Sequence, residues 1–176
     1  MSEPEFGGIE LLDTISVSGS SVQSVVFGAG GDGAQGRALD GDADGEYILI
    51  CNMRHTAPGF ATYFGIRPNG LVTNQSGNMS TIVNAGHVLA GPLAFMGIGR
   101  IESAGVKSQL RVEIMAAAGR ARLAHSQGIT PVTSCYGFGI WSDTSTKITS
   151  LVVHCEEGAF IDAGSEFQLF RRGVWL

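Results

Sequence analysis

The sequence contains few charged residues and very little lysine. Charged residues make up 15% of the 176 residues, and Lys107 and Lys147 are the only two lysines. A surface that follows a phosphate backbone needs clustered lysine and arginine, so nucleic-acid binding is disfavoured. Long apolar stretches are missing as well, because no run approaches the roughly 20 residues of a membrane-spanning helix. We therefore expect a partner that is neither a nucleic acid nor a membrane.

Cysteine is scarce too, and its placement excludes a disulfide framework. Cys51, Cys135 and Cys155 are odd in number, far apart, and surrounded by apolar residues. A disulfide scaffold or a zinc site would need paired, closely spaced cysteines, whereas free cysteine is among the most buried residue types. We predict three buried thiols. The start of the chain is acidic where a secretion signal would be basic, so we expect folding in a cytoplasm.

Glycine is abundant and favours an all-β fold. The chain has 26 glycines against five prolines, and short runs of valine, isoleucine, threonine and serine lie between them. A chain of this length fits one domain with one core. We predict a single antiparallel β-sandwich, jelly-roll-like, over residues 9–176. Residues 1–8, which include Pro4, Gly7 and Gly8, are expected to form a short flexible N-terminal arm.

Alternation of apolar and polar residues predicts about ten short strands. The clearest cover residues 9–17, 21–27, 60–67, 107–115, 120–126, 135–141, 148–154 and 166–171. In residues 107–115 the pattern places Leu110, Val112 and Ile114 on one face and Arg111 and Glu113 on the other. A chain of many short strands separated by turns is typical of a sandwich, jelly roll or barrel.

One local motif predicts a hairpin. Arg67-Pro68-Asn69-Gly70 combines a proline, which pre-sets the turn, with an Asn-Gly pair, which tolerates positive φ. We therefore expect residues 71–74 to return antiparallel to the preceding strand. Residues 75–80 are polar and are expected to form a loop, followed by a short strand at 81–83. Residues 93–101 are apolar and interrupted by glycine, which indicates a buried strand with bulges or close backbone packing.

The densest run of carboxylates leads into the most continuous apolar run, at residues 39–51. Asp40, Asp42, Asp44 and Gly45 match the first half of a calcium-binding loop. The twelfth position of that loop should be a bidentate glutamate, and here it is Cys51. We therefore predict a turn that feeds a buried strand, with the aspartates facing water or a neighbouring chain. A non-helical calcium site stays open as the alternative.

Residues 28–33 match the glycine pattern of dinucleotide-binding loops, but the context is wrong. That motif needs a helix whose first turn faces the pyrophosphate, and more glycine and aspartate follow here. A surface loop is the better prediction.

Other catalytic patterns are weak. The four histidines lie in separate segments without metal-site spacing, and no G-x-S-x-G nucleophile turn occurs. Carboxylate pairs for sugar cleavage are available within residues 40–46 or among Glu156, Glu157 and Asp162, and nothing singles out one pair. We assign no catalytic, cofactor-binding or metal-binding residues and expect a protein that is not an enzyme.

Charge is unevenly distributed along the chain. Residues 1–50 carry nine acidic residues and one basic residue, whereas residues 51–176 carry ten basic and seven acidic residues. Such an asymmetry favours attraction between copies of the chain or toward a basic partner, and scattered solvated charge is the alternative.

Several segments taken together resemble small β-sandwich, jelly-roll-like virion structural proteins of tailed bacteriophages. They are residues 25–27 leading into 39–47, the turn at 67–70, and the ending at 148–153 and 160–170. The resemblance implies a homo-oligomeric, often trimeric, non-enzymatic component of the virion. Exposed strand edges, which symmetric copies can cover, are compatible with this.

The resemblance leaves three functions open. The first is a capsid cement or decoration protein that forms homotrimers, binds the major capsid protein or another virion protein, and joins the virion in the host cytoplasm. The alternative is a tail-fibre or receptor-binding module that recognises a host surface glycan through exposed aromatic residues such as Trp141 or Trp175. The second alternative is a β-sandwich hydrolase, which needs converging carboxylates or histidines.

Overall fold

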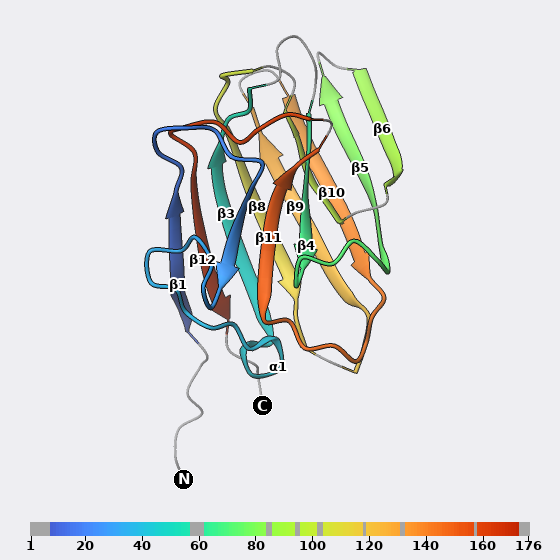
Figure 1. Ribbon diagram of the computed structural model, residues 1–176. Coiled ribbons are helices and arrows are strands. Elements are labelled where there is room, and N and C mark those ends of the chain that lie inside the picture. Colours follow the sequence, from blue (N-terminus) through green and yellow to red (C-terminus); the bar gives the residue numbers. More distant parts are fainter. Residues whose placement is uncertain are drawn as a thin grey trace.

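Two sheets packed face to face form the protein, shown as a computed structural model in Figure 1. The structure describes residues 8–56, 62–83, 86–93, 96–101, 104–117, 119–130, 133–156 and 158–172. The first six strands are β1 (Ile9–Ser16), β2 (Ser24–Gly28), β3 (Glu46–Met53), β4 (Thr62–Pro68), β5 (Gln75–Val83) and β6 (Gly86–Leu93). The remaining six are β7 (Met96–Ile101), β8 (Ser108–Met115), β9 (Arg122–Ile129), β10 (Thr133–Trp141), β11 (Ser150–Cys155) and β12 (Glu166–Arg172).

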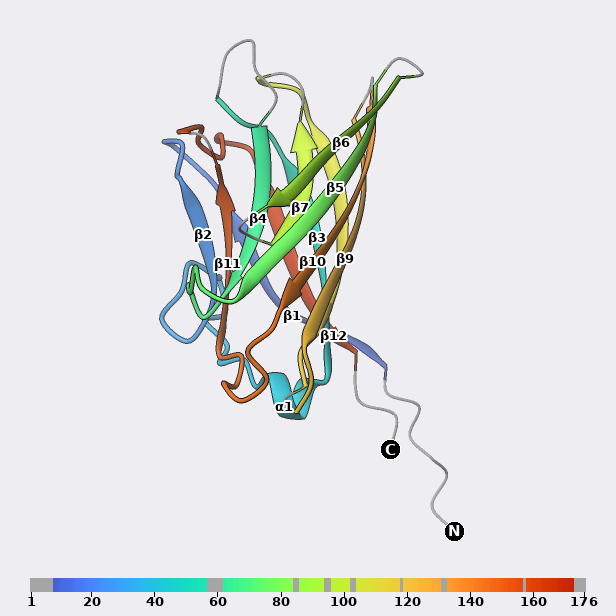
Figure 2. The same cartoon turned by 90° about the vertical axis from the view of Figure 1, so that its right-hand side faces the viewer.

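The larger sheet has eight strands in the order β1-β12-β3-β8-β9-β10-β5-β6, and the smaller has four in the order β2-β11-β4-β7. Every pairing between these strands is antiparallel. Figure 2 shows the two sheets edge-on, with the smaller one covering one face of the larger. The predicted all-β antiparallel sandwich is confirmed. The described residues contain twelve strands instead of about ten.

One short helix, α1 (Gly41–Asp44), lies at the end of the sandwich where β3 begins (Figure 1). None of the described helical residues forms a segment with the length and apolar character needed to cross a bilayer. The predicted N-terminal arm lies outside the described residues except for Gly8.

The core lies between the sheets and is filled by alternate residues of the strands. In β8, Leu110, Val112 and Ile114 are buried as predicted, whereas Arg111 is exposed. The three cysteines are free and buried, which confirms their prediction, and burial raises the pKa of the Cys51 thiol. Such thiols stay protonated and act as small apolar side chains.

Glycines let the two sheets approach closely where β10 of the larger sheet crosses β7 of the smaller one. A Cβ atom on Gly137 would lie 2.6 Å from the carbonyl oxygen of Gly97, and one on Gly139 would lie 2.7 Å from Cβ of Met96. Both distances are below van der Waals contact, so no larger side chain fits on the inner face of β10 at these two positions. Alternation along the strand places the neighbouring Tyr136 and Phe138 on the outer face.

The predicted hairpin after β4 is wrong, although its turn forms. Asn69 and Gly70 have φ of 53° and 66°, and the Gly70 amide donates to the Arg67 carbonyl at 3.2 Å. The Asn69 side-chain oxygen then accepts from the amides of Thr149 and Ser150 at 2.7 and 3.1 Å. These bonds tie the turn to the start of β11. Residues 71–74 form no strand, and the chain crosses to the other sheet as β5.

The predicted loop at residues 75–80 is also wrong, because these residues form the first part of β5. They pair with β10 in register from Trp141↔Gln75 to Tyr136↔Ser80. Their polarity reflects one exposed face, since Ser76 and Asn78 point to solvent while Gly77 is buried. Strand β6 was missing from the sequence prediction.

We expect that Gly137→Ala destabilises the protein, because the added methyl group meets the backbone of β7. Overpacking of this kind costs about 1–3 kcal/mol in the free energy of unfolding. Urea denaturation followed by tryptophan fluorescence measures the effect. Gly8→Ala is the matched control, since nothing lies within 4 Å of a Cβ at Gly8. Equal midpoints for the two variants would contradict the close approach of the sheets.

Candidate functional site

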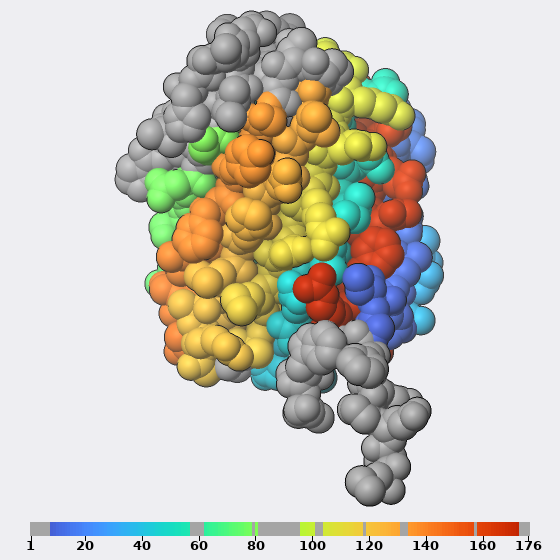
Figure 3. All heavy atoms as spheres, turned by 180° about the vertical axis from the view of Figure 1, so that it is seen from behind, coloured from blue at the N-terminus to red at the C-terminus, as the bar shows by residue number. Residues whose placement is uncertain are grey.

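The outer face of the eight-stranded sheet carries large apolar side chains at the middle of β10. Tyr136 and Phe138 are 42% and 41% exposed, whereas the residues that alternate with them on the inner face are buried. This reverses the usual pattern, in which the bulky residues of a strand face the core. Figure 3 shows this face, with β5 in green at one side and β1 in blue at the other.

Strand register places the outward-facing residues in rows that cross the sheet. The central row runs Gln168, Ile50, Arg111, Gln127, Tyr136, Ser80. The row beside it runs Phe170, Ile48, Glu113, His125, Phe138, Asn78, and the row on the other side runs Glu166, Asn52, Gln109, Ile129, Ser134. Neighbouring strands are about 4.8 Å apart, so the central row spans roughly 24 Å from β12 to β5.

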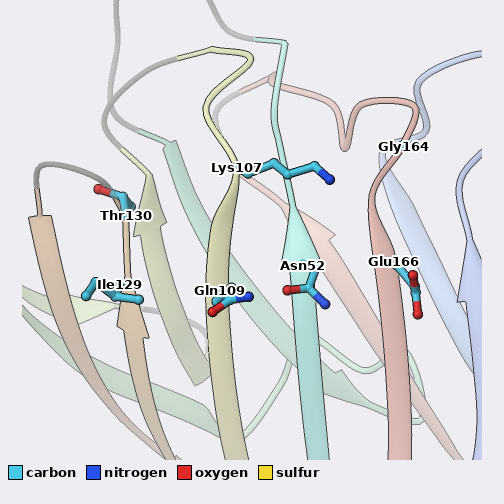
Figure 4. Close-up of a pocket in the computed structure, with 7 residues that line it drawn as sticks. All are labelled: Asn52, Lys107, Gln109, Ile129, Thr130, Gly164 and Glu166. Atoms are coloured by element: carbon cyan, nitrogen blue, oxygen red, sulfur yellow. The ribbon is translucent and has the colours of Figure 1, made fainter.

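A groove follows these rows. One part has a volume of about 500 Å³ over β3, β8, β9 and β10, and a second part of about 570 Å³ extends to Glu166 on β12. Asn52, Gln109 and Ile129 line both parts, so the two volumes are continuous. Figure 4 shows these three residues on three adjacent strands, with Lys107 reaching across toward the end of β3.

The charges in the groove are balanced. The Arg111 guanidinium donates to one oxygen of Glu113 through Nη2 at 2.7 Å and through Nε at 3.2 Å. At the β12 side, the Glu166 carboxylate accepts from the Gln168 amide at 3.2 Å. Lys107 supplies the remaining positive charge at the rim. These four charged side chains therefore carry equal numbers of positive and negative charges.

The polar groups of the groove are mainly amides. Gln109 and Gln127 are exposed and Asn52 is half-buried. A side-chain amide both donates and accepts hydrogen bonds, as a hydroxyl group does. Amides beside aromatic rings can bind a molecule that has apolar faces and hydroxyl-bearing edges.

The acidic stretch at residues 40–46 forms a turn and not a cation site. Asp40 caps α1 by accepting from the Ala43 amide at 3.2 Å, and it also forms an ion pair with Lys147. These contacts lower the pKa of the Asp40 carboxyl, the Lys147 hydrogen bond most of all. The prediction of a turn that leads into a buried strand is confirmed. The turn is the single helical turn α1, and the strand is β3.

Asp44 differs from the prediction because it is buried instead of facing water. Its Oδ2 accepts from the Tyr47 hydroxyl at 2.6 Å, and its Oδ1 pairs with Arg171 at 3.0 Å. Burial, followed by the hydrogen bond to Asp44, raises the pKa of Tyr47 well above its usual range. Arg171 also pairs with Glu10 at 2.6 Å, so one guanidinium joins β1, α1 and β12. Asp40 and Asp44 therefore have partners within the chain, which argues against the calcium alternative.

Of the histidines and carboxylates considered from the sequence, His154 and Glu156 are in contact, with Nδ1 of the imidazole 2.8 Å from a carboxylate oxygen. His55 and His154 are buried between strands, His125 lies on the outer face, and His87 belongs to β6. Burial lowers the pKa of His154 to about 3, so its imidazole is neutral at physiological pH. Among the described residues no three histidine, cysteine, aspartate or glutamate side chains are grouped for a metal ion.

Two of the other carboxylates that the sequence offered for sugar cleavage bind side chains elsewhere in the chain. Glu156 pairs with Arg67 at 2.9 Å, and Asp162 accepts from the Ser21 hydroxyl at 3.0 Å. Glu157 lies outside the described residues. No carboxylate pair for sugar cleavage is brought together by these contacts.

The glycine-rich residues 28–33 form a turn, as predicted. The Gly31 amide donates to the Gly28 carbonyl at 3.0 Å and the Asp32 amide to the Val26 carbonyl at 2.8 Å. No helix follows before residue 41, so the geometry of a dinucleotide-binding loop is absent from this described segment.

The expectation that Trp141 is an exposed aromatic residue is wrong. Trp141 is fully buried, with the Arg122 guanidinium 4.9 Å from its ring, and Trp175 lies outside the described residues. Tyr136 and Phe138 were not singled out. The sequence held a signal, because Tyr136 and Phe138 alternate with glycine at positions 137 and 139, which places small residues on the opposite face of the strand.

No protein-family model and no curated protein matches the chain. Among solved structures, alginate lyase Aly36B aligns with 17% identity and a TM-score of 0.34, covering 93% of this chain and 80% of the lyase. A double mutant of that lyase in complex with alginate trisaccharide aligns with 16% identity and a TM-score of 0.29, covering 97% and 90%.

The CBM2 module of the evolved Dit of Lactobacillus casei BL23 phage J-1 aligns with 5% identity and a TM-score of 0.18, covering 92% of this chain and 77% of the module. At these values none of the three similarities assigns a family or an activity.

We expect that Tyr47→Phe destabilises the protein, because it leaves a buried oxygen of Asp44 without its hydroxyl donor. The loss of such a bond costs roughly 1–3 kcal/mol. Tyr136→Phe is the matched control, since its hydroxyl belongs to an exposed side chain. Thermal unfolding followed by circular dichroism compares the two, and equal melting temperatures would contradict the assigned role of Tyr47.

Proposed function

We propose that the protein is a non-enzymatic carbohydrate-binding module and that an extended glycan lies in the groove on the outer face of the eight-stranded sheet. The observation that carries this proposal is the outward placement of Tyr136 and Phe138 on β10, beside a continuous groove. Exposed apolar groups next to a polar groove mark interaction sites. In a phage virion, such a module corresponds to a tail-fibre or receptor-binding protein that recognises a host surface glycan.

The chemistry of the groove suits a sugar. The ring of a pyranose has an apolar face of C–H groups, which packs on an aromatic ring, and hydroxyl groups at its edges, which exchange hydrogen bonds with amides. Tyr136 supplies the first kind of contact, and Gln127, its register partner on β9, supplies the second. The two kinds of contact are therefore adjacent.

The shape of the groove favours a chain of sugars over a single one. It crosses β12, β3, β8, β9 and β10, and the rows of side chains repeat at the spacing of the strands. A pocket for a small ligand buries most of that ligand on all sides, whereas this groove is open along its length. A polymer can lie across it and repeat the same contacts at successive units.

A specific observation also favours the capsid decoration protein that the sequence resemblance implied. Strand β1 is an edge strand of the larger sheet, and Ile9 and Leu11 on it are 59% and 39% exposed. A second copy of the chain that covered this edge would remove apolar surface and unpaired backbone groups from water. A homotrimer bound to the major capsid protein is the corresponding second proposal.

We expect that Tyr136→Ala and Phe138→Ala each weaken glycan binding at least about tenfold, equivalent to about 1.4 kcal/mol. A glycan array identifies the bound structures, and calorimetry with a soluble polysaccharide measures the affinity. Phe160→Ala is the control, because Phe160 is 44% exposed and lies in the connection between β11 and β12, not in the rows on the outer face of the larger sheet. An array without any bound glycan would reject the proposal. Release of new reducing ends from the polymer would reject the non-enzymatic part.

We expect a stable trimer in solution, and not a monomer, if capsid decoration is the function. Multi-angle light scattering over a range of protein concentrations distinguishes these states. Leu11→Lys tests the edge strand, since a charge there should dissociate an oligomer that uses β1. A trimer that is unchanged by this substitution would contradict the proposed use of the edge.

A further inference from the structure

We propose that the groove selects uncharged glycans and excludes acidic ones, and this inference rests on the proposed function. Lys107, Arg111 and Glu166 line the groove, and Glu113 lies beside it and is paired with Arg111. The two positive charges of this set are matched by two negative ones. A site for polyanions needs an excess of positive charge that faces the ligand.

The position of Arg111 is stronger evidence for this selectivity than the number of charges in the groove. Arg111 and Glu113 are two residues apart on the same face of β8, and two nitrogens of the guanidinium bind one carboxylate oxygen. An acidic group that approached Arg111 would come close to the Glu113 carboxylate as well. Like charges at such distances repel each other, so the attraction of the guanidinium is largely cancelled.

Glu166 has the same effect at the β12 end of the groove. Its carboxylate lines the groove, and the Gln168 amide that donates to it is neutral. The negative charge of Glu166 is therefore not balanced by a cation of its own, and it disfavours an acidic sugar at this end. A hydroxyl group, in contrast, can donate to the carboxylate and gain a charge-assisted hydrogen bond.

Between these charged residues the floor of the groove is neutral. Asn52, Gln109 and Gln127 offer amides, and Tyr136 and Ser134 offer hydroxyl groups. Each amide and hydroxyl accepts as well as donates, which matches sugar hydroxyls and gives no preference to a group that only accepts, such as a carboxylate or sulfate. The floor and its flanking charges therefore favour the same ligand, an uncharged glycan strand.

The wild-type protein and two variants test this inference by affinity electrophoresis and calorimetry, with neutral glucans, galactans and mannans as one set of probes and polygalacturonate as the acidic probe. The wild-type protein is expected to bind at least one neutral polymer, with an affinity that changes less than about twofold between 50 and 500 mM sodium chloride. It is expected not to bind polygalacturonate at either salt concentration.

Glu113→Gln removes the carboxylate next to Arg111 with almost no change in shape. This variant is expected to gain binding to polygalacturonate at low salt, at least about tenfold over the wild-type protein, and to lose it at high salt. Asp42→Asn is the matched control, because it makes the same change in net charge on exposed α1, away from the groove. It should behave as the wild-type protein does.

Three results would overturn the inference or its basis, and they differ from one another. Preferential, salt-sensitive binding of polygalacturonate by the wild-type protein would reject neutral selectivity and leave glycan binding intact. Equal behaviour of Glu113→Gln and Asp42→Asn would reject the role of Glu113. Failure of the wild-type protein to bind every glycan on an array and every polymer tested would reject the proposed function itself.

Discussion

The close crossing of β10 and β7 is the constraint on which the candidate site depends. Gly137 lies so near the backbone of Gly97 that the inner face of β10 has no room for a side chain there. The strand still needs bulky residues, because β structure favours aromatic and branched side chains. They stand on the outer face instead, as Tyr136 and Phe138. The packing between the sheets thus places the aromatic residues beside the groove.

At the opposite edge of the larger sheet, an electrostatic contact holds the edge strand β1 in place. Arg171 on β12 binds both Glu10 on the edge strand β1 and the buried Asp44 on α1. Breaking such a contact costs more than an exposed ion pair would suggest, because it leaves a buried carboxylate with fewer partners. One of the carboxylates that suggested a calcium loop in the sequence, Asp44, therefore links the start of β3 to the arginine that holds the edge strand β1.

The sequence predicts those parts of the fold in which local pattern and long-range pairing agree. The strict alternation of apolar and polar residues predicts strand β8 correctly, together with its buried and exposed faces, because residues such as Val112 and Arg111 differ sharply in polarity. The turn at Asn69 was predicted correctly, but the strand that follows it was not. The side chain of Asn69 binds Thr149, just before β11 and 80 positions later, and alternation does not reveal such a contact. The groove was not predictable in this way. It depends on the neighbours of β10, and the order of the strands cannot be deduced from alternation alone.

The composition of the outer face bears on whether a ligand or another protein chain covers it. A permanent interface between subunits is more apolar than ordinary surface and excludes water from its centre. Here Gln127 and then Arg111 follow Tyr136 in its row, and the side chains of Arg111 and Glu113 are 51% and 38% exposed. Covering this row with an apolar surface would strip water from an ion pair and from an amide without replacing their hydrogen bonds. A glycan replaces that water with hydroxyl groups of the same hydrogen-bonding capacity, so the polar rows are better satisfied by a sugar chain than by a second copy of the protein.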